Sequence, residues 1–257
     1  MISLKDFAKN NELIIVAHRG SSGTAPENTL AAFREAIDAG ANMIEADVQV
    51  TSDREIVVFH DKGLSRTTDG VGFTKNQNLS DIKNLDAGSW FDKKFSGERV
   101  PLLSEVLDLI QNKAYLNIEI KNVKNNHYLE NLKKILNILI YYNYLDKVLI
   151  SSFYYDSIKF IKNKHPEVAT AAIKIPKDNR LPSEIAREIN CDAFVCSLSE
   201  INNDISIDAT ENNIYLGVYS IDSKEDLMKV LKLKIKAIVT NYPEKIIMEL
   251  NNLKIQS

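Results

Sequence analysis

The sequence predicts an α/β fold of the TIM (β/α)8 barrel class, in which eight parallel strands alternate with helices. A length of 257 residues is in the range of one such barrel. About eight apolar, β-branched runs recur along the chain, and amphipathic stretches separate them. The runs are continuous rather than alternating, which is typical of parallel strands that are covered by helices.

The elements follow one another in a regular order. The predicted strands are Leu13–Ala17, Asn42–Val48, Tyr115–Ile120, Lys147–Ser151, Val168–Ile173, Asp192–Cys196, Ile214–Val218 and Ala237–Thr240. The predicted helices are Glu27–Ala39, Leu129–Tyr142, Tyr155–Asn163, Pro182–Ile189, Lys224–Leu231 and Pro243–Leu250. The first helix follows Pro26, carries an apolar stripe and ends at Gly40, so it has both a start and a stop signal.

The alternation is broken once, between Asp61 and Pro101. This stretch is rich in Gly, Asn, Asp, Ser and Thr and has no long apolar stripe. A connection of this length inside a compact domain is usually functional or a small appended unit. We therefore expect one domain over residues 1–257, with an inserted lobe at about residues 62–101 after the second strand.

Composition narrows the classes of function. The formal net charge is -3, which argues against a nucleic-acid binder because binding to a phosphate backbone needs a concentrated basic surface. The amino-terminal residues lack a secretory pattern, and no segment approaches the ~20 apolar residues of a membrane span. We expect a cytoplasmic protein without stable membrane association.

The two cysteines are expected to be core residues. Cys191 and Cys196 lie five apart in what is predicted to be one strand, so their side chains would point to opposite faces. This placement favours small buried residues over a disulfide or a metal pair.

Three acidic residues fall in predicted strands. Glu45 and Asp47 are two apart in an apolar strand and share one face, and Glu119 lies near the end of the next barrel strand. Buried carboxylates cost several kcal/mol unless a cation or hydrogen-bond donors compensate them. All-oxygen ligands favour one divalent cation, Mg²⁺ or Ca²⁺. The alternative is that Arg, Lys or backbone donors neutralise the acids, as Lys121 would do for Glu119.

Two of the four histidines directly follow apolar strand-like runs. His18 follows Leu13–Ala17, and His60 follows the run Glu55–Phe59, which suits an acid/base pair at the catalytic end of a barrel. His127 and His165 lie in polar surroundings and are predicted to be at the surface. Arg19 and Lys121 are suited to bind phosphate oxygens.

In their order and spacing, these residues resemble the motifs of the glycerophosphodiester phosphodiesterase family. The matching stretches are His18-Arg19-Gly20, Pro26-Glu27-Asn28-Thr29, Ile44-Glu45-Ala46-Asp47-Val48, His60 to Gly70, and Ile118-Glu119-Ile120-Lys121. The resemblance implies a TIM barrel with a small insertion that hydrolyses small glycerophosphodiesters to glycerol 3-phosphate and an alcohol.

The resemblance also implies roles for individual residues. Glu45, Asp47 and Glu119 match the metal ligands, His18 and His60 the acid/base pair, and Arg19 and Lys121 the phosphate contacts. One histidine would deprotonate a glycerol hydroxyl that attacks phosphorus, the other would protonate the departing alcohol, and water would then open the cyclic phosphate.

Two positions depart from the family pattern. Tyr219 stands where a Trp is common, and Asn241 where an Asp is usual. Tyr219 is expected either to wall the glycerol site or to pack at the barrel rim. Two further functions stay open: a phospholipase C or D acting on intact lipid, and a non-catalytic phosphate-binding barrel.

Overall fold

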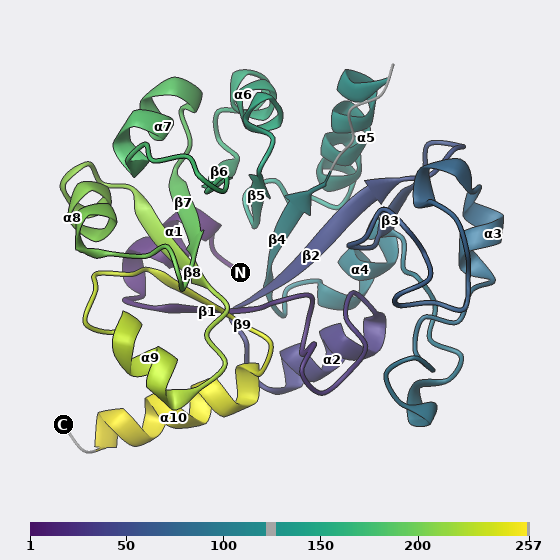
Figure 1. Ribbon diagram of the computed structural model, residues 1–257. Coiled ribbons are helices and arrows are strands. Elements are labelled where there is room, and N and C mark those ends of the chain that lie inside the picture. The colour runs from purple at the N-terminus through teal and green to yellow at the C-terminus, as the bar shows by residue number, and fades with distance from the viewer. Residues whose placement is uncertain (122–126, 256–257) are drawn as a thin grey trace.

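The computed structural model describes residues 1–121 and 127–255, and within them eight parallel strands close into a barrel surrounded by helices (Figure 1). Because β1 pairs with both β2 and β9, the barrel has no open edge. The barrel strands are β1 Ile14–Ala17, β2 Met43–Val50, β4 Tyr115–Ile120, β5 Val148–Ser152, β6 Ala169–Ile173, β7 Ala193–Ser197, β8 Tyr215–Tyr219 and β9 Ala237–Thr240. The predicted fold class is confirmed.

The helices follow the strands as expected of this class. They are α1 Leu4–Asn10, α2 Leu30–Asp38, α3 Leu79–Lys83, α4 Leu103–Ile110, α5 Tyr128–Tyr141, α6 Tyr155–Lys164, α7 Pro182–Ile189, α8 Asn203–Glu211, α9 Lys224–Val230 and α10 Pro243–Ile255. The sequence did not predict α1, α3, α4 or α8. No helix in this part of the chain is long and apolar enough to cross a bilayer.

The start of the first predicted helix was wrong by three residues. Helix α2 begins at Leu30, and the side chain of Thr29 caps it by accepting a hydrogen bond from the backbone N–H of Ala32. Asn28 has φ 58°, a left-handed conformation that a helix interior does not contain. Residues 27–29 are therefore a turn, and this turn faces the barrel mouth.

The barrel interior changes from apolar to polar along the strand direction. At the amino-terminal end of the strands, Ile14, Val16, Met43, Tyr115 and Val239 pack against Leu4 and Ala8 of α1. Farther along β2, the face that carries Met43 presents Glu45 and then Asp47. Apolar packing thus fills one end of the barrel and leaves ionisable groups at the other.

A ninth strand, β3 Ile56–Val58, lies outside the barrel and corrects the prediction for His60. It runs antiparallel to β2, with Val58 opposite Val48. His60 therefore does not follow a barrel strand, but the hairpin turns the chain back toward the mouth. The backbone N–H of Phe59 donates to the carbonyl of Asp47 at 2.9 Å, which brings His60 close to the level of Asp47.

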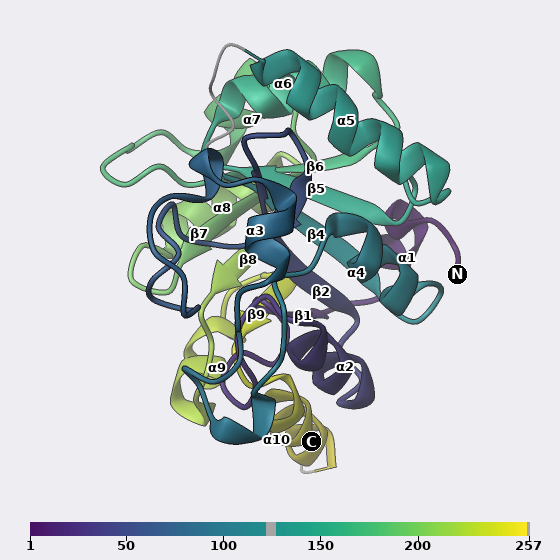
Figure 2. The same ribbon diagram turned by 90° about the vertical axis from the view of Figure 1, so that its right-hand side faces the viewer.

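The segment between β3 and α4 contains only short elements, namely α3 and the 3-10 turns Thr74–Asn76 and Lys93–Phe95. Figure 2 turns this segment toward the viewer. It has a small apolar core of its own, formed by Val57, Phe59, Leu64, Ile82, Ala87 and Val100. Separate packing of this kind lets the segment hold a fixed position beside the barrel mouth.

Both cysteines are buried and free, as expected of core residues. Cys191 was wrongly placed in a strand, because β7 begins at Ala193. Cys196 lies within β7.

Candidate active site

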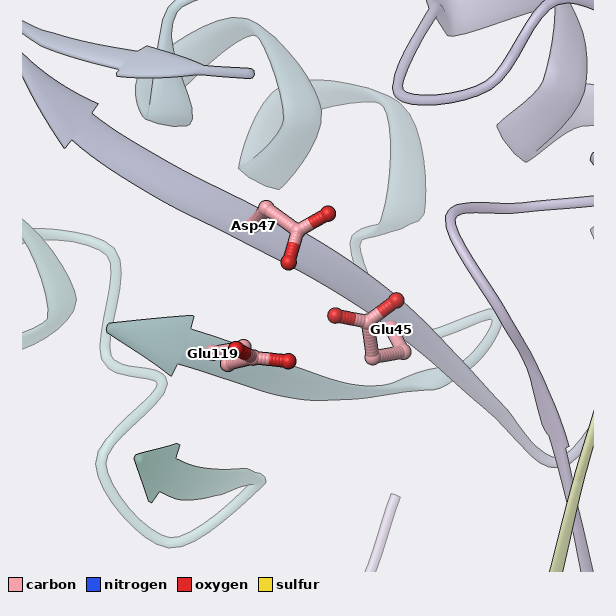
Figure 3. Close-up of side chains that lie close together, drawn as sticks. All are labelled: Glu45, Asp47 and Glu119. Atoms are coloured by element: carbon pink, nitrogen blue, oxygen red, sulfur yellow. The ribbon is translucent and has the colours of Figure 1, made fainter. Parts of the chain in front are cut away.

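Three buried carboxylates meet at the carboxyl-terminal end of β2 and β4. Asp47 of β2 lies opposite Glu119 of β4 in the parallel ladder, and Glu45 lies two residues before Asp47. Figure 3 shows their side chains pointing toward a common space. One oxygen from each lies within 4.8 Å of the other two. The relative exposures are only 3%, 0% and 9% for Glu45, Asp47 and Glu119, so water does little to screen their repulsion.

The carboxylates differ in their electrostatic surroundings. Burial raises the pKa of Glu45 well above its usual value, and Asp47 and Glu119 raise it further. Burial and Asp47 also raise the pKa of Glu119. Burial acts in the same direction on Asp47, but Lys121 and Arg19 outweigh it and lower the pKa of Asp47. The surroundings therefore compensate the negative charge of Asp47 but not that of all three carboxylates together.

Two cationic side chains flank the carboxylates. Lys121 Nζ is 2.9 Å from Asp47 Oδ1 and also pairs with Glu119, and Arg19 Nε is 3.2 Å from Asp47 Oδ2. Arg and Lys side chains thus neutralise part of the acidic cluster, as the alternative to a metal site predicted. Glu45 is the exception, because its Oε2 accepts from the backbone N–H of Arg19 at 2.8 Å while its buried Oε1 has no hydrogen-bond partner. An unpartnered buried carboxylate oxygen beside two other carboxylates fits a cation site.

The turn after β1 places both His18 and Arg19. Arg19 has φ 54° and Gly20 has φ 81°, and a Cβ on Gly20 would lie 2.6 Å from the backbone of Ala32. Only glycine therefore allows the turn to approach α2 this closely. His18 Nδ1 lies 2.7 Å from Asn241 Oδ1. Burial lowers the pKa of His18, and the nearby Arg19 adds to this effect.

His60 belongs to a second hydrogen-bonded network. Its Nδ1 lies 2.6 Å from Asp61 Oδ1, and Arg66 donates to both oxygens of Asp61. The same Arg66 donates to both oxygens of Glu27, and Glu27 accepts from Arg19 at 2.8 Å. One chain of ion pairs thus connects the residue beside His60 to the residue beside His18.

Tyr219 lies at the end of β8, opposite Ser197 of β7. It is half-buried and packs against the apolar interior of the barrel. Burial raises the pKa of its phenol to about 12, so the hydroxyl is neutral at physiological pH.

Comparison with known proteins shows to which family the chain belongs. The model of the glycerophosphoryl diester phosphodiesterase family matches residues 18–245. The chain belongs to this family. A glycerophosphodiester phosphodiesterase of Caldanaerobacter subterraneus subsp. tengcongensis is 36% identical over 91% of this chain and 96% of its own. One of Bacillus subtilis is 31% identical over 91% and 85%.

Solved structures of phosphodiesterases resemble this chain along most of its length. An Oleispira antarctica phosphodiesterase, crystallised with the product sn-glycerol-3-phosphate, superposes with a TM-score of 0.88 at 30% identity, covering 95% of this chain and 99% of its own. The glycerophosphodiester phosphodiesterase of Agrobacterium tumefaciens gives 0.80 at 26% identity, with 90% and 97% covered. The predictions of the family and of an enzyme are confirmed.

The site of this phosphodiesterase also contains residues whose place in it the sequence did not predict. Asn28 donates to Asp47 Oδ2 at 2.8 Å, and its own oxygen accepts from the backbone N–H of Asp47. Glu27 and Arg66 organise the network around His60. Asn28, Glu27 and Arg66 all lie inside the quoted motifs, so the motif positions were a signal that could have identified them.

Proposed function

We propose that this chain hydrolyses small glycerophosphodiesters to glycerol 3-phosphate and an alcohol, with one divalent cation held by Glu45, Asp47 and Glu119. The observation that carries the proposal is the buried carboxylate triad facing both histidine-bearing turns. Oxygen ligands alone suit Mg²⁺ or Ca²⁺. When bound, the cation supplies charge that stabilises the phosphorane-like transition state.

Arg19 and Lys121 are the proposed phosphate contacts. Both cations reach Asp47 from opposite oxygens, so a phosphate bound over the triad would meet a guanidinium on one side and an ammonium on the other. Clamping of this kind lowers the barrier, because negative charge grows on the phosphate oxygens during the displacement.

The hydrogen bonds support different roles for the histidines. Asn241 Oδ1 can only accept, so His18 Nδ1 carries the proton and Nε2 keeps its lone pair. We infer that His18 is the base for the attacking glycerol hydroxyl. Burial lowers the pKa of His60, and the hydrogen bond with the Asp61 carboxylate offsets only part of this effect. We infer from this hydrogen bond that His60 protonates the departing alcohol. In the second step of the reaction, His60 takes the proton of the water that opens the cyclic phosphate. His18 then returns its proton to the glycerol oxygen.

Tyr219 is proposed to wall the glycerol. Its half-buried ring stands at the mouth within electrostatic range of Glu119 and Lys121, which fits a contact with the apolar face of the glycerol backbone. A Tyr219→Ala variant should raise KM more than it lowers kcat.

The decisive experiment is a panel of deacylated phosphodiesters carrying choline, ethanolamine, glycerol or inositol. Released glycerol phosphate is measured after chelation and after adding back Mg²⁺ or Ca²⁺. We expect loss of activity with chelator and recovery with the cation. Full activity in cation-free buffer would refute the metal site, and inactivity on the whole panel would refute the substrate class.

Intact lipid is the second candidate substrate, because the inserted segment exposes apolar side chains. Val71 is 78% and Phe73 52% exposed, and Phe73 pairs with Gly63, three residues after His60. Phospholipid vesicles in the same panel test this candidate. Release of diacylglycerol, phosphatidic acid or a cyclic lipid phosphate at a rate above that of the deacylated substrates would favour it.

A further inference from the structure

His18 stands at one end of a row of three hydrogen-bonded side chains. The row crosses the ends of three consecutive barrel strands: His18 follows β1, Asn241 follows β9, and Asp222 lies between β8 and α9. His18 Nδ1 is 2.7 Å from Asn241 Oδ1, and Asn241 Nδ2 donates to Asp222 Oδ2 at 2.6 Å. None of these contacts involves the carboxylate triad.

Asp222 is held firmly by its neighbours. Its Oδ1 accepts from the backbone N–H of Asn241 at 2.8 Å and from Thr240 Oγ1 at 3.0 Å, and Lys245 Nζ donates to its backbone carbonyl at 2.8 Å. All the groups that face the Asp222 carboxylate in these contacts are donors. Its position is therefore fixed from β9 and from α10 as well as from its own loop.

The orientation of Asn241 follows from this arrangement. An amide side chain can present either its oxygen or its nitrogen to a neighbour, whereas an ionised carboxylate only accepts hydrogen bonds. If the amide of Asn241 were turned over, its oxygen would face Asp222 and two acceptors would repel each other. Ser22 Oγ does not decide the matter, because it lies 2.7 Å from both Asn241 Oδ1 and the carbonyl of His18 and has one proton to donate.

The orientation of Asn241 in turn fixes the proton on His18. A neutral imidazole carries its proton on either nitrogen, and the partner of one nitrogen decides which form is present. With Asn241 Oδ1 facing it, Nδ1 must carry the proton, and Nε2 is left with a lone pair. We propose that Asp222 is a positioning residue that, through Asn241, holds His18 in the tautomer whose Nε2 can accept a proton. Its effect on rate rests on the proposed function, whereas its effect on the tautomer does not.

The test replaces the carboxylate by an amide. In Asp222→Asn, the new side chain can donate or accept, so Asn241 is free to turn and His18 is free to move its proton to Nε2. We expect kcat to fall by roughly 10²–10⁴-fold, the range that a positioned base contributes, with little change in KM. Asp226→Asn in the first turn of α9 is the matched control, because Asp226 is hydrogen-bonded to Ser223 and Lys229 and not to the row of side chains behind His18. It should keep wild-type activity.

A double exchange, Asp222→Asn with Asn241→Asp, restores the pattern of donors and acceptors with the two groups swapped. The carboxylate at 241 accepts the Nδ1 proton, and the amide at 222 donates to that carboxylate while its oxygen still accepts from Thr240. We expect the exchange to recover most of the kcat lost in Asp222→Asn. No recovery in a folded double variant would overturn the proposal. The exchange also serves as the test if the single variant does not fold.

Ring ¹⁵N shifts report the tautomer without any substrate. The chain has only four histidines, and comparison with His18→Gln assigns the signals of His18. Above pH 7 we expect a proton on Nδ1 in the wild type and in the double exchange, and a shift toward Nε2 in Asp222→Asn. An unchanged tautomer in Asp222→Asn would overturn the proposal even if activity fell. A shifted tautomer in a chain inactive on every glycerophosphodiester would instead refute the proposed function alone.

Discussion

Glu45→Gln should separate the binding of the cation from the stability of the barrel. In the wild type, Glu45 contributes a buried negative charge beside Asp47 and Glu119, and its Oε1 has no hydrogen-bond partner. The amide has nearly the same shape, its oxygen can still accept from the backbone of Arg19, and its NH₂ group can donate to a neighbouring carboxylate. Without a cation, we therefore expect the variant to be at least as stable as the wild type, against the usual direction of a core substitution.

The magnitude follows from linkage. A cation present at a hundred times its Kd stabilises the folded chain by about 2.7 kcal/mol. A domain of this size gains roughly 2–4 °C in Tm per kcal/mol, so saturating cation should raise the wild-type Tm by about 5–11 °C. We expect a rise of less than about 2 °C for Glu45→Gln.

The assay is calorimetry after chelation, repeated with increasing Mg²⁺ or Ca²⁺. Glu225→Gln, an exposed position in the first turn of α9, is the control and should keep the full rise in Tm. A full rise in Glu45→Gln would show that the cation binds elsewhere. A wild-type Tm that does not respond to either cation would refute the reasoning from the unpartnered oxygen.

The remaining predictions concern the histidines and their network. His18→Gln and His60→Gln should each lower kcat by roughly 10²–10⁴-fold with unchanged far-UV circular dichroism. His165→Gln is the control and should stay near the wild-type rate. Comparable rates in all three variants would exclude an acid/base role for either histidine. Burial lowers the pKa of His18, so this base stays neutral until the pH falls below 6.5. The acidic limb of the pH profile of kcat/KM should therefore have its midpoint below pH 6.5. A midpoint above this value would contradict the assignment of His18 as the base. Arg66 lowers the pKa of Asp61 to about 2, so Arg66→Gln should disturb the partner of His60 and lower kcat about tenfold. The loss of stability should be no more than about 1 kcal/mol, because the Arg66 side chain is 45% exposed. A loss of stability without a loss of kcat would disprove the role of the ion-pair network around His60.

The strand positions and the carboxylate pair could be predicted because both depend on local periodicity. A run of apolar residues in a strand identifies the buried segment, and a spacing of two puts Glu45 and Asp47 on one face whatever the rest of the chain does. The position of Glu119 needed one further assumption, that neighbouring barrel strands end at the same level. The ladder between β2 and β4 bears this out, with Glu119 opposite Asp47.

The remaining features depend on contacts between distant segments. The late start of α2 reflects the use of Asn28 by Asp47, nineteen residues later, which outweighs the helix signals around Pro26. Arg66 and Glu27 are thirty-nine residues apart. Asp222 reaches His18 only through a third side chain. Local spacing carries no information on such pairs, so only the folded structure reveals them.

The hairpin of β2 and β3 gives the chain between Thr51 and Glu55 an unusual importance. Side chains in a strand alternate between faces, so a slip of one residue in the pairing of Val48 with Val58 would turn His60 away from the triad while leaving the barrel intact. One added or deleted residue in that turn would thus act as a catalytic mutation at a site that touches no substrate. Loops on the surface of a barrel usually tolerate changes in length. We expect the turn between Thr51 and Glu55 not to tolerate them, because its length sets the pairing of β3 with β2.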